Sequence, residues 1–567
     1  MRVVWTLSCL LFMTLDLSAA DPRWERYAAY EPRIRALNPR LHELGGIIAR
    51  IGETVQNPEL QGLRAAFAEA EAKLKEAIVT SGLTKIEAEY MEGAGQRDRL
   101  IDAHLGDSAP LKDALSTLQA AKKIVEELRP RLGSLSPEEA LRYAEARHRE
   151  TSANTALYYM RSDFFAMGGE KMHALYKQWN DAKSRDKTVS AAQKAFDGAR
   201  KTLAAAEQKA GRSSPLAAPL VKEEEEINAK TKAIREEMDA LAKELRGQWD
   251  TFSGKVTQKP EKPADKPRDW PCSVSIPKGC VQIKGAMIAG GVANDPCIQS
   301  VLAASSFAIV QIQGIYVMNT PMHREIFETA LATLTAQCGH PELAHVPWLT
   351  GGTSASVITA RNIAAWRPER AVGVIHFAGG NLHHMRDIGK PWSLAGIPLL
   401  AINGEKESCG PEGGIRPEYG RLTQWVMIRE QLLRFRAHSP DHFMSLIVIP
   451  EADHAGWSSS MSHLVAEFVQ QAILARVPEQ PEPAKTTVIC RTINPDFGWL
   501  ADADFCQPRH PPAPVSRYAG KPADAFWHFN EYLAAGIESF HRGRLMPDPT
   551  RKHPVPADWP PAPAPRP

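Results

Sequence analysis

The stretch PWLTGGTSASVITARNIAAW (residues 347–366) has the pattern of a buried β-strand, a tight turn and a helix in direct succession. Within it, residues 352–356 (GTSAS) match the pattern G-x-S-x-G except in the last place, where Ser356 is still small. Small residues are needed at these positions because a strained strand-to-helix turn brings backbone segments very close together. Such a turn lifts the hydroxyl group of Ser354 into solvent, so Ser354 is a candidate nucleophile.

Short apolar runs alternate with helical segments on both sides of this turn. Helices of about 10–20 residues between such runs predict a mostly parallel sheet covered on both faces, and therefore an α/β domain over residues 272–480. The predicted strands lie at 284–289, 307–312, 346–349, 371–377, 397–402 and 443–449, and the helices at 296–304, 321–338, 355–366, within 419–437 and within 459–476.

Two later segments offer partners for Ser354, whose hydroxyl group is a poor nucleophile at neutral pH without an adjacent base. His454, in IPEADHAGW (residues 449–457), follows the last predicted strand and is the candidate base. LLAINGEKE (residues 399–407) follows the preceding strand and supplies carboxylates that could orient the imidazole. The order Ser…Glu…His along the chain is the order of an α/β-hydrolase.

Four segments together resemble the α/β-hydrolase superfamily, and more narrowly secreted esterases of the polyhydroxybutyrate-depolymerase and feruloyl-esterase type. The resemblance covers about residues 280–480, roughly a third of the chain, and implies the fold of that superfamily for the α/β domain. The segments that carry it are HVPWLTGGTSAS, RPERAVGVIHFAGG, IPLLAINGEKE and VIPEADHAGW.

The resemblance implies roles for individual residues. The acid of the family lies three residues after the glycine that ends its strand, which is Glu407 here. Glu405 is a secondary candidate, and Asp453 is less favoured because it adjoins His454 in sequence.

An oxyanion would be held by two backbone N–H groups. The turn after Ser354 supplies that of Ala355, at the beginning of the helix. The resemblance implies a second donor from the loop after the first strand of the unit, at Gly291 or Val292.

These assignments predict a serine hydrolase that acts on carboxylic esters of unknown size and needs no cofactor. His376, His383, His384 and Asp387 match no metal-site spacing, so no metal site is predicted. Two alternatives remain open, a serine peptidase on the same fold and a non-catalytic scaffold or adhesion protein with a degenerate hydrolase domain.

The rest of the chain divides by composition. Residues 21–253 carry apolar residues at helical spacing, which predicts an all-α, coiled-coil-like domain of long antiparallel hairpins. Association with a protein or a cell surface is the role we consider for this domain. Residues 254–271 are rich in Pro and Lys and predict a linker. We expect residues 481–545 to form an extension with one amphipathic helix that packs on the α/β domain. Residues 546–567 are expected to form a Pro-rich tail.

The beginning of the chain predicts export. Residues 1–20 combine a basic start, an apolar run and small residues before a cleavage point, as in a secretory signal peptide, so we expect a secreted or periplasmic protein without a membrane span after cleavage. Cys272 with Cys280 and Cys490 with Cys506 are possible local disulfides, although the sequence cannot fix their connectivity.

The charge balance excludes one class of partner. The chain has 68 Lys and Arg against 66 Asp and Glu in 567 residues. A general nucleic-acid-binding protein would carry a clear basic excess, so nucleic acid is not an expected partner.

Overall fold

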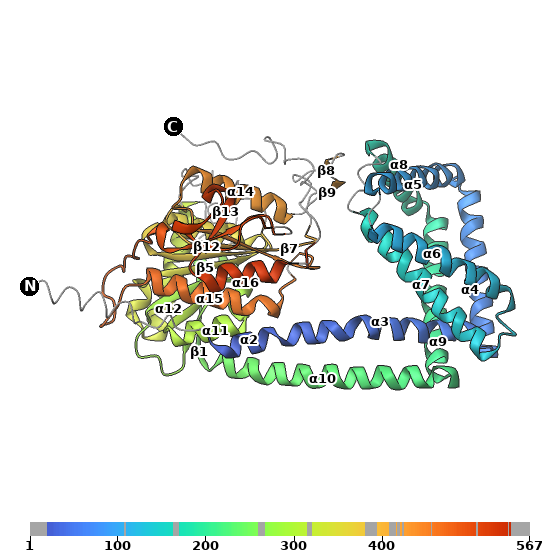
Figure 1. Cartoon of the computed structure of the whole chain (residues 1–567), viewed down its shortest axis with the longest axis horizontal. Coiled ribbons are helices and arrows are strands. Elements are labelled where there is room, and N and C mark those ends of the chain that lie inside the picture. The colour runs from blue at the N-terminus through green and yellow to red at the C-terminus, as the bar shows by residue number, and fades with distance from the viewer. Residues whose placement is uncertain are drawn as a thin grey trace, which may run out of the picture. The chain divides into compact units, whose positions relative to one another are not determined.

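The computed structural model (Figure 1) describes residues 20–106, 109–162, 169–258, 267–314, 320–379, 394–407, 415–416, 420–421, 424–454, 456–505, 508–542 and 544–545. The chain forms two compact units. The helical unit comprises Arg33–Ile234 and Gly414–Leu422. The sheet unit comprises Met1–Pro32, Arg235–Gly413 and Thr423–Pro567.

Long helices joined by short turns build the helical unit. Ser136 and Glu139 form the reciprocal capping box that their spacing predicts, with Glu139 N–H donating to Ser136 Oγ over 3.2 Å and Ser136 N–H to Glu139 Oε2 over 2.9 Å. The helices are α3 (Tyr30–Thr54), α4 (Pro58–Thr80), α5 (Thr84–Leu105), α6 (Ala109–Leu128), α7 (Pro137–Ser162), α8 (Gly169–Arg185), α9 (Lys187–Ser213) and α10 (Ala218–Arg246), of which α3 begins and α10 ends in the sheet unit.

Among the described residues of this unit, apolar side chains gather in several small clusters. One cluster contains Ile47, Ile48 and Ile51, and another contains Ala77, Ile78, Leu83, Trp179 and Val189. Each helix pair therefore buries its own apolar stripe, as expected for hairpins that pack along their length.

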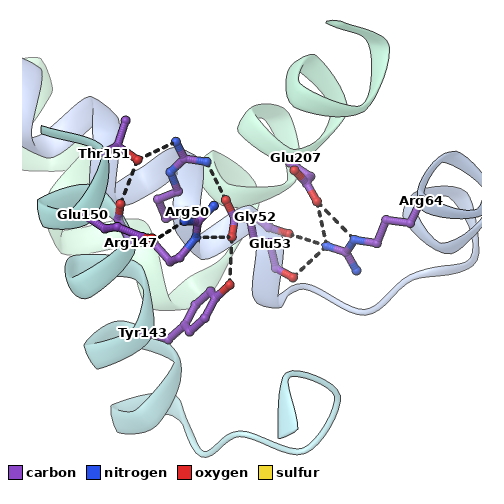
Figure 2. Close-up of polar contacts among 9 residues, drawn as sticks. All are labelled: Arg50, Gly52, Glu53, Arg64, Tyr143, Arg147, Glu150, Thr151 and Glu207. Atoms are coloured by element: carbon purple, nitrogen blue, oxygen red, sulfur yellow. Dashed lines mark hydrogen bonds and ion pairs between the residues drawn. The ribbon is translucent and has the colours of Figure 1, made fainter. Parts of the chain in front are cut away.

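Ion pairs join the helices between these clusters (Figure 2). Glu53 on α3 pairs with Arg50 over 2.5 Å and with Arg147 on α7 over 3.4 Å. Arg64 on α4 pairs with Glu207 on α9 over 3.1 Å and also donates to the Glu53 carbonyl oxygen. The network links four helices, and each of these side chains is at most 30% exposed.

An eight-stranded, mostly parallel sheet forms the centre of the sheet unit. Its order is β1-β2-β4-β3-β5-β6-β7-β10, and only the pairings of β1 with β2 and of β2 with β4 are antiparallel. The strands are β1 (Trp249–Gln258), β2 (Arg268–Pro277), β3 (Gly285–Ala289), β4 (Phe307–Ile312), β5 (Trp348–Thr353), β6 (Ala371–Phe377), β7 (Leu399–Gly404) and β10 (Met444–Ile449).

The six strands predicted from the sequence correspond to β3, β4, β5, β6, β7 and β10. The helices between them are α11 (Pro296–Ala304), α12 (Pro321–Cys338), α13 (Ser356–Trp366), α14 (Gln424–His438) and α15 (Ser462–Arg476). The carboxyl ends of the parallel strands meet at one edge of such a sheet, which is where open α/β folds place their functional groups.

The Pro- and Lys-rich segment differs from the expected linker. Residues 249–258 and 268–277 are β1 and β2, paired in antiparallel register from Trp249 opposite Pro277 to Gln258 opposite Arg268. Alternate side chains of β2, including Trp270 and Val274, are buried. The Pro residues counted as linker signals fall mostly at 260–267, between the strands, and only residue 267 of these is described.

The first helix also differs from the expected boundary at residue 21. Helix α2 (Pro22–Ala28) belongs to the sheet unit, where it packs against α15 (Figure 1). Trp24 and Tyr27 are buried, and the Trp24 indole donates to Ser300 Oγ over 3.4 Å. The sequence analysis assigned this segment to the helical domain, because helical periodicity does not reveal what a helix packs against.

The C-terminal extension contains a small sheet as well as a helix. Strands β11 (Trp499–Asp502), β12 (Ala513–Pro514) and β13 (Ala525–His528) pair in the order β12-β11-β13. Helix α16 (Glu531–His541) follows. The spacing of Phe526, Phe529, Leu533, Ile537 and Phe540 suggests one helix, but Phe526 lies in β13. The helix begins only after Asn530, whose side chain accepts the Leu533 N–H. Trp527 packs with Phe443, so the extension lies against the main sheet.

The predicted local disulfide between Cys272 and Cys280 is absent. Both thiols are free, Cys272 inside the core and Cys280 donating to the Gln282 carbonyl oxygen over 3.2 Å. Cys490 is free as well, and Cys506 lies outside the described residues. No helix within the described ranges is long and apolar enough to cross a bilayer. The predicted signal peptide and Pro-rich tail fall almost wholly outside those ranges.

Candidate active site

Ser354 lies in the turn between β5 and α13, as the sequence pattern predicts. Its φ of 55° is left-handed, which is uncommon for a residue with a side chain. Gly352 allows this turn, because a Cβ at that position would lie 2.3 Å from the Ser356 carbonyl oxygen. The strand and the helix thus approach each other more closely than any side chain at residue 352 would permit.

Two hydrogen-bond arrangements hold the turn. Ser356 Oγ accepts from the Thr353 N–H and donates to the Thr353 carbonyl oxygen, both over 2.7 Å. The Ser354 N–H donates to the Phe377 carbonyl oxygen at the end of β6 over 2.9 Å. Ser356, which stands where the motif usually has Gly, therefore closes the turn with its side chain.

Ser354, His454 and Glu407 come together in space from three segments. His454 Nε2 lies 2.8 Å from Ser354 Oγ, and His454 Nδ1 lies 2.5 Å from Glu407 Oε1. The His454 side chain is 53% exposed, whereas that of Glu407 is only 1% exposed. One imidazole thus connects a hydroxyl group at the surface with a carboxylate in the interior.

Glu407 is held on its other oxygen as well. Its Oε2 accepts from Asn403 Nδ2 over 3.0 Å and from the Gly404 N–H over 3.2 Å. These donors keep a buried carboxylate hydrogen-bonded, which burial of a charge requires. Asn403, buried at the end of β7, is a residue that the sequence analysis missed, and its place directly before Gly404 was the available signal.

The two other candidate acids, Glu405 and Asp453, do not share the position of Glu407 next to the imidazole. Glu405 is buried and its Oε2 accepts the Glu451 N–H over 2.8 Å, so it holds the beginning of the loop that carries His454. Asp453 is exposed. Of the three carboxylates weighed from the sequence, Glu407 is the one whose contact with the His454 ring is described.

The candidate oxyanion donors lie in two segments. Ala355 follows Ser354 and is exposed. Gly291 and Val292 begin a short 3-10 turn after β3 (Gly291–Asn294), where Gly291 is exposed and Val292 is buried. A Cβ placed on Gly291 would lie 4.0 Å from Thr353 Oγ1, so this loop faces the turn of Ser354.

A cavity of about 480 Å³ adjoins the same two segments. It is lined by Gly290, Gly291 and Ser356, by Gln311 on β4 and by Gln313 just after that strand. The apolar parts of its wall include Phe327 and Ile363. The cavity thus offers a mixed polar and apolar surface next to the candidate nucleophile.

Trp457, three residues after His454, connects the site to its surroundings. Its indole N–H donates to Asp295 Oδ2 over 2.9 Å, and its ring meets that of Phe377 edge-on at 5.0 Å. Asp295 is buried, and burial raises the pKa of its carboxyl group. Sequence analysis missed Asp295, whose one local signal is its place before Pro296, where it caps α11.

Within the described ranges, no three His, Cys, Asp or Glu residues are arranged to hold a metal ion. His376 is fully buried on β6, and burial lowers the pKa of its imidazole well below the usual value. His383, His384 and Asp387 lie outside the described residues.

Comparisons with known proteins give low overall similarity. No protein-family model matches the chain, and no curated protein matches it. Among solved structures, a ferulic acid esterase is 10% identical, with 40% of this chain and 99% of that chain covered and a TM-score of 0.28.

Two further solved structures are similar to the same extent. An S-formylglutathione hydrolase from Agrobacterium tumefaciens is 14% identical over 40% of this chain and 98% of its own, with a TM-score of 0.27. A dienelactone hydrolase from Anabaena variabilis is 17% identical, with 40% of this chain and 98% of that chain covered and a TM-score of 0.25.

Proposed function

We propose that this chain is a serine hydrolase with an α/β-hydrolase fold and that it cleaves carboxylic esters through an acyl-enzyme. The observation that carries the proposal is the single imidazole of His454 between Ser354 Oγ and the buried Glu407 carboxylate. The three residues follow β5, β7 and β10 at the carboxyl edge of the sheet, in the chain order that this fold uses.

The proposed reaction begins with proton transfer from the Ser354 hydroxyl group to His454 Nε2 as Oγ attacks the carbonyl carbon. Glu407 accepts the hydrogen bond of Nδ1–H, which fixes the useful tautomer and stabilises the imidazolium. His454 then gives the proton to the departing alkoxide. Water, deprotonated by His454, releases the acid and restores Ser354.

The negative charge on the carbonyl oxygen needs donors in the tetrahedral state. The Ala355 N–H, next to the beginning of α13, and the N–H of Gly291 or Val292 are the proposed donors. The loop of Gly291 faces the turn of Ser354, which supports this choice. Loss of one such donor costs about 3–4 kcal/mol in other enzymes.

A fluorophosphonate probe tests the proposal, because it labels only an activated serine. Wild-type protein should be labelled, Ser354→Ala should not, and Ser273→Ala on β2 should behave as wild type. Turnover of a short-chain p-nitrophenyl ester should then exceed turnover of an aminoacyl amide. Amide turnover alone would indicate a peptidase, and no labelling of the wild type would indicate a scaffold.

We further propose that the helical unit associates with a protein surface, for which a second copy of the chain is the first candidate. Large apolar side chains that are more than half exposed support this, because burial of their apolar area in an interface would be favourable. They are Val79, Met91, Leu100, Tyr158 and Tyr176. Sedimentation of the full chain tests it: a concentration-dependent dimer that Met91→Glu abolishes is expected, and a monomer at every concentration contradicts self-association.

We also propose export with cleavage before Asp21, on the strength of the leader pattern in residues 1–20. N-terminal sequencing of protein recovered outside the cytoplasm should begin at Asp21. Recovery of the protein in the cytoplasm with its first residues intact would contradict export.

A further inference from the structure

The loop that carries His454 ends in the segment Trp457-Ser458-Ser459-Ser460-Met461-Ser462, which we term the WSSSMS segment. Two carboxylates distant in sequence, Glu31 and Asp295, bind it. On the basis of the proposed function, we infer that Glu31 and Asp295 are positioning residues for His454. The N-terminal arm, defined as α2 and the first turn of α3, is then part of the scaffold of the active site.

The exposure of His454 shows why its loop matters. Its side chain is 53% exposed, so packing around the ring cannot by itself fix the imidazole. The ring must instead be placed by the backbone from which it projects, together with its bond to Glu407. Whatever fixes the two ends of the loop therefore sets the distance between His454 Nε2 and Ser354 Oγ.

The beginning of the loop is fixed from β7. The Glu451 N–H donates to Glu405 Oε2 over 2.8 Å, and Glu451 has a left-handed φ of 63°. The Lys406 N–H donates to the Ala452 carbonyl oxygen over 2.9 Å. A Cβ at Gly404 would lie 2.3 Å from that same oxygen, so the loop lies directly on the end of β7.

Asp295 fixes the end of the loop from the opposite direction. Its Oδ2 accepts from the Trp457 indole over 2.9 Å and from Ser462 Oγ, while its Oδ1 accepts the N–H groups of Cys297 and Ile298. Asp295 also ends the turn that begins at Gly291. One buried carboxylate thus ties the proposed oxyanion loop to the His454 loop.

Glu31 binds the middle of the WSSSMS segment with a single oxygen. Its Oε2 accepts from Ser458 Oγ over 2.8 Å, from Ser459 Oγ over 3.0 Å and from the Ser460 N–H over 3.1 Å. The three serines are buried, so without Glu31 their hydroxyl and amide groups would lose partners in the interior. A carboxylate is also favourable at this place, because it lies before the beginning of α15.

The N-terminal arm is firmly seated where Glu31 projects from it. Trp24, Tyr27 and Tyr30 are buried. The arm also makes a contact away from the His454 loop, where the Tyr532 hydroxyl group on α16 donates to Glu25 over 3.0 Å. This second contact allows the docking of the arm to be separated from its action on the loop.

The test compares Glu31→Ala, Glu31→Gln and the matched control Tyr532→Phe in the full chain. Each is assayed for p-nitrophenyl ester turnover, for the rate of fluorophosphonate labelling and for melting temperature. Glu31→Ala should lower kcat and the labelling rate about 10-fold with KM unchanged, because misplacement of a catalytic group by about 1 Å is costly. Glu31→Gln, which keeps an acceptor oxygen, should recover most of the loss, and Tyr532→Phe should retain wild-type rates.

A second pair of variants guards against misfolding. Ser458→Ala removes one donor from the loop side and should lower kcat in the same way, and Asp295→Asn should do so with KM unchanged. If Glu31→Ala and Ser458→Ala keep wild-type kcat while the wild type is labelled, the inference fails and the proposed function stands. If the wild type itself is not labelled, the proposed function fails instead.

Discussion

At the scale of single residues, the candidate site depends on backbone conformations that side chains rarely adopt. Ser354 and Glu451 both have positive φ, of 55° and 63°. Residues held in this region cost about 1–3 kcal/mol and persist only where the surroundings impose them. Here two hydrogen bonds hold the residues in place. The Ser354 N–H donates to the Phe377 carbonyl oxygen, and the Glu451 N–H donates to the Glu405 carboxylate. Both strained residues serve to bring one hydroxyl group to one imidazole.

Relief of this strain gives a prediction for stability. Ser354→Gly should raise the free energy of unfolding by about 1 kcal/mol relative to Ser354→Ala, because glycine adopts a positive φ without a steric penalty. Both variants should lack esterase activity. Urea denaturation of the two proteins measures the difference, and equal midpoints would indicate that the turn is not strained.

The two glutamates after β7 should differ in their effects. Glu407→Gln should lower kcat by about 1,000-fold, because a neutral partner no longer fixes the tautomer or stabilises the imidazolium. Glu405→Gln keeps an acceptor for the Glu451 N–H and should lower kcat much less. Steady-state kinetics with melting temperatures as the control distinguish the two roles, and equal losses would contradict the assignment of Glu407.

At the scale of elements, the first two strands show how composition can mislead. Pro and Lys suggested a linker over residues 254–271, yet β1 and β2 extend the sheet at its edge. An edge strand tolerates exposed Lys, as in Lys255, and has one side without strand partners. The buried alternation through Val256, Trp270 and Val274 was the signal that the proline count concealed.

Replacement of a buried strand residue separates a strand from a linker. Trp270 is 2% exposed, so Trp270→Ala should lower the free energy of unfolding by about 3–5 kcal/mol. Val281 follows β2 and is 90% exposed, so it offers a control. Val281→Ala should change the free energy of unfolding by less than about 0.5 kcal/mol. Urea denaturation measures both, and a neutral Trp270→Ala would indicate a linker after all.

At the scale of the whole molecule, the chain combines two units with different kinds of core. In the sheet unit one large cluster of buried residues connects β1 to β5 with α12, whereas the clusters of the helical unit are small. In the helical unit, α3 and α9 approach closely at glycines. A Cβ on Gly52 would lie 1.8 Å from the Glu207 carbonyl oxygen, and one on Gly211 would lie 2.1 Å from that of Ile48.

This close approach predicts that the helical unit can be destabilised by itself. Gly52→Ala should force α3 and α9 apart and lower the temperature of one calorimetric transition, with ester turnover largely retained. Gly62→Ala on α4, where a Cβ meets nothing within 4 Å, should leave that transition unchanged or raise it, since Ala favours helix by about 1 kcal/mol. A single transition lowered together with activity would show that the units unfold as one.

The sequence by itself determined the local elements and the order of the chemical groups along the chain. Periodicity and turn residues are local properties, so β3 to β7, β10 and the helices between them could be predicted, as could Ser354, Glu407 and His454 as candidates. Only the tertiary structure decided what local pattern cannot encode. It selected Glu407 over Glu405 as the partner of the imidazole, turned an apparent linker into two strands, and brought Glu31 to the His454 loop. Burial and contact depend on segments that are distant in sequence, such as Glu31 and Ser458, which local periodicity does not connect.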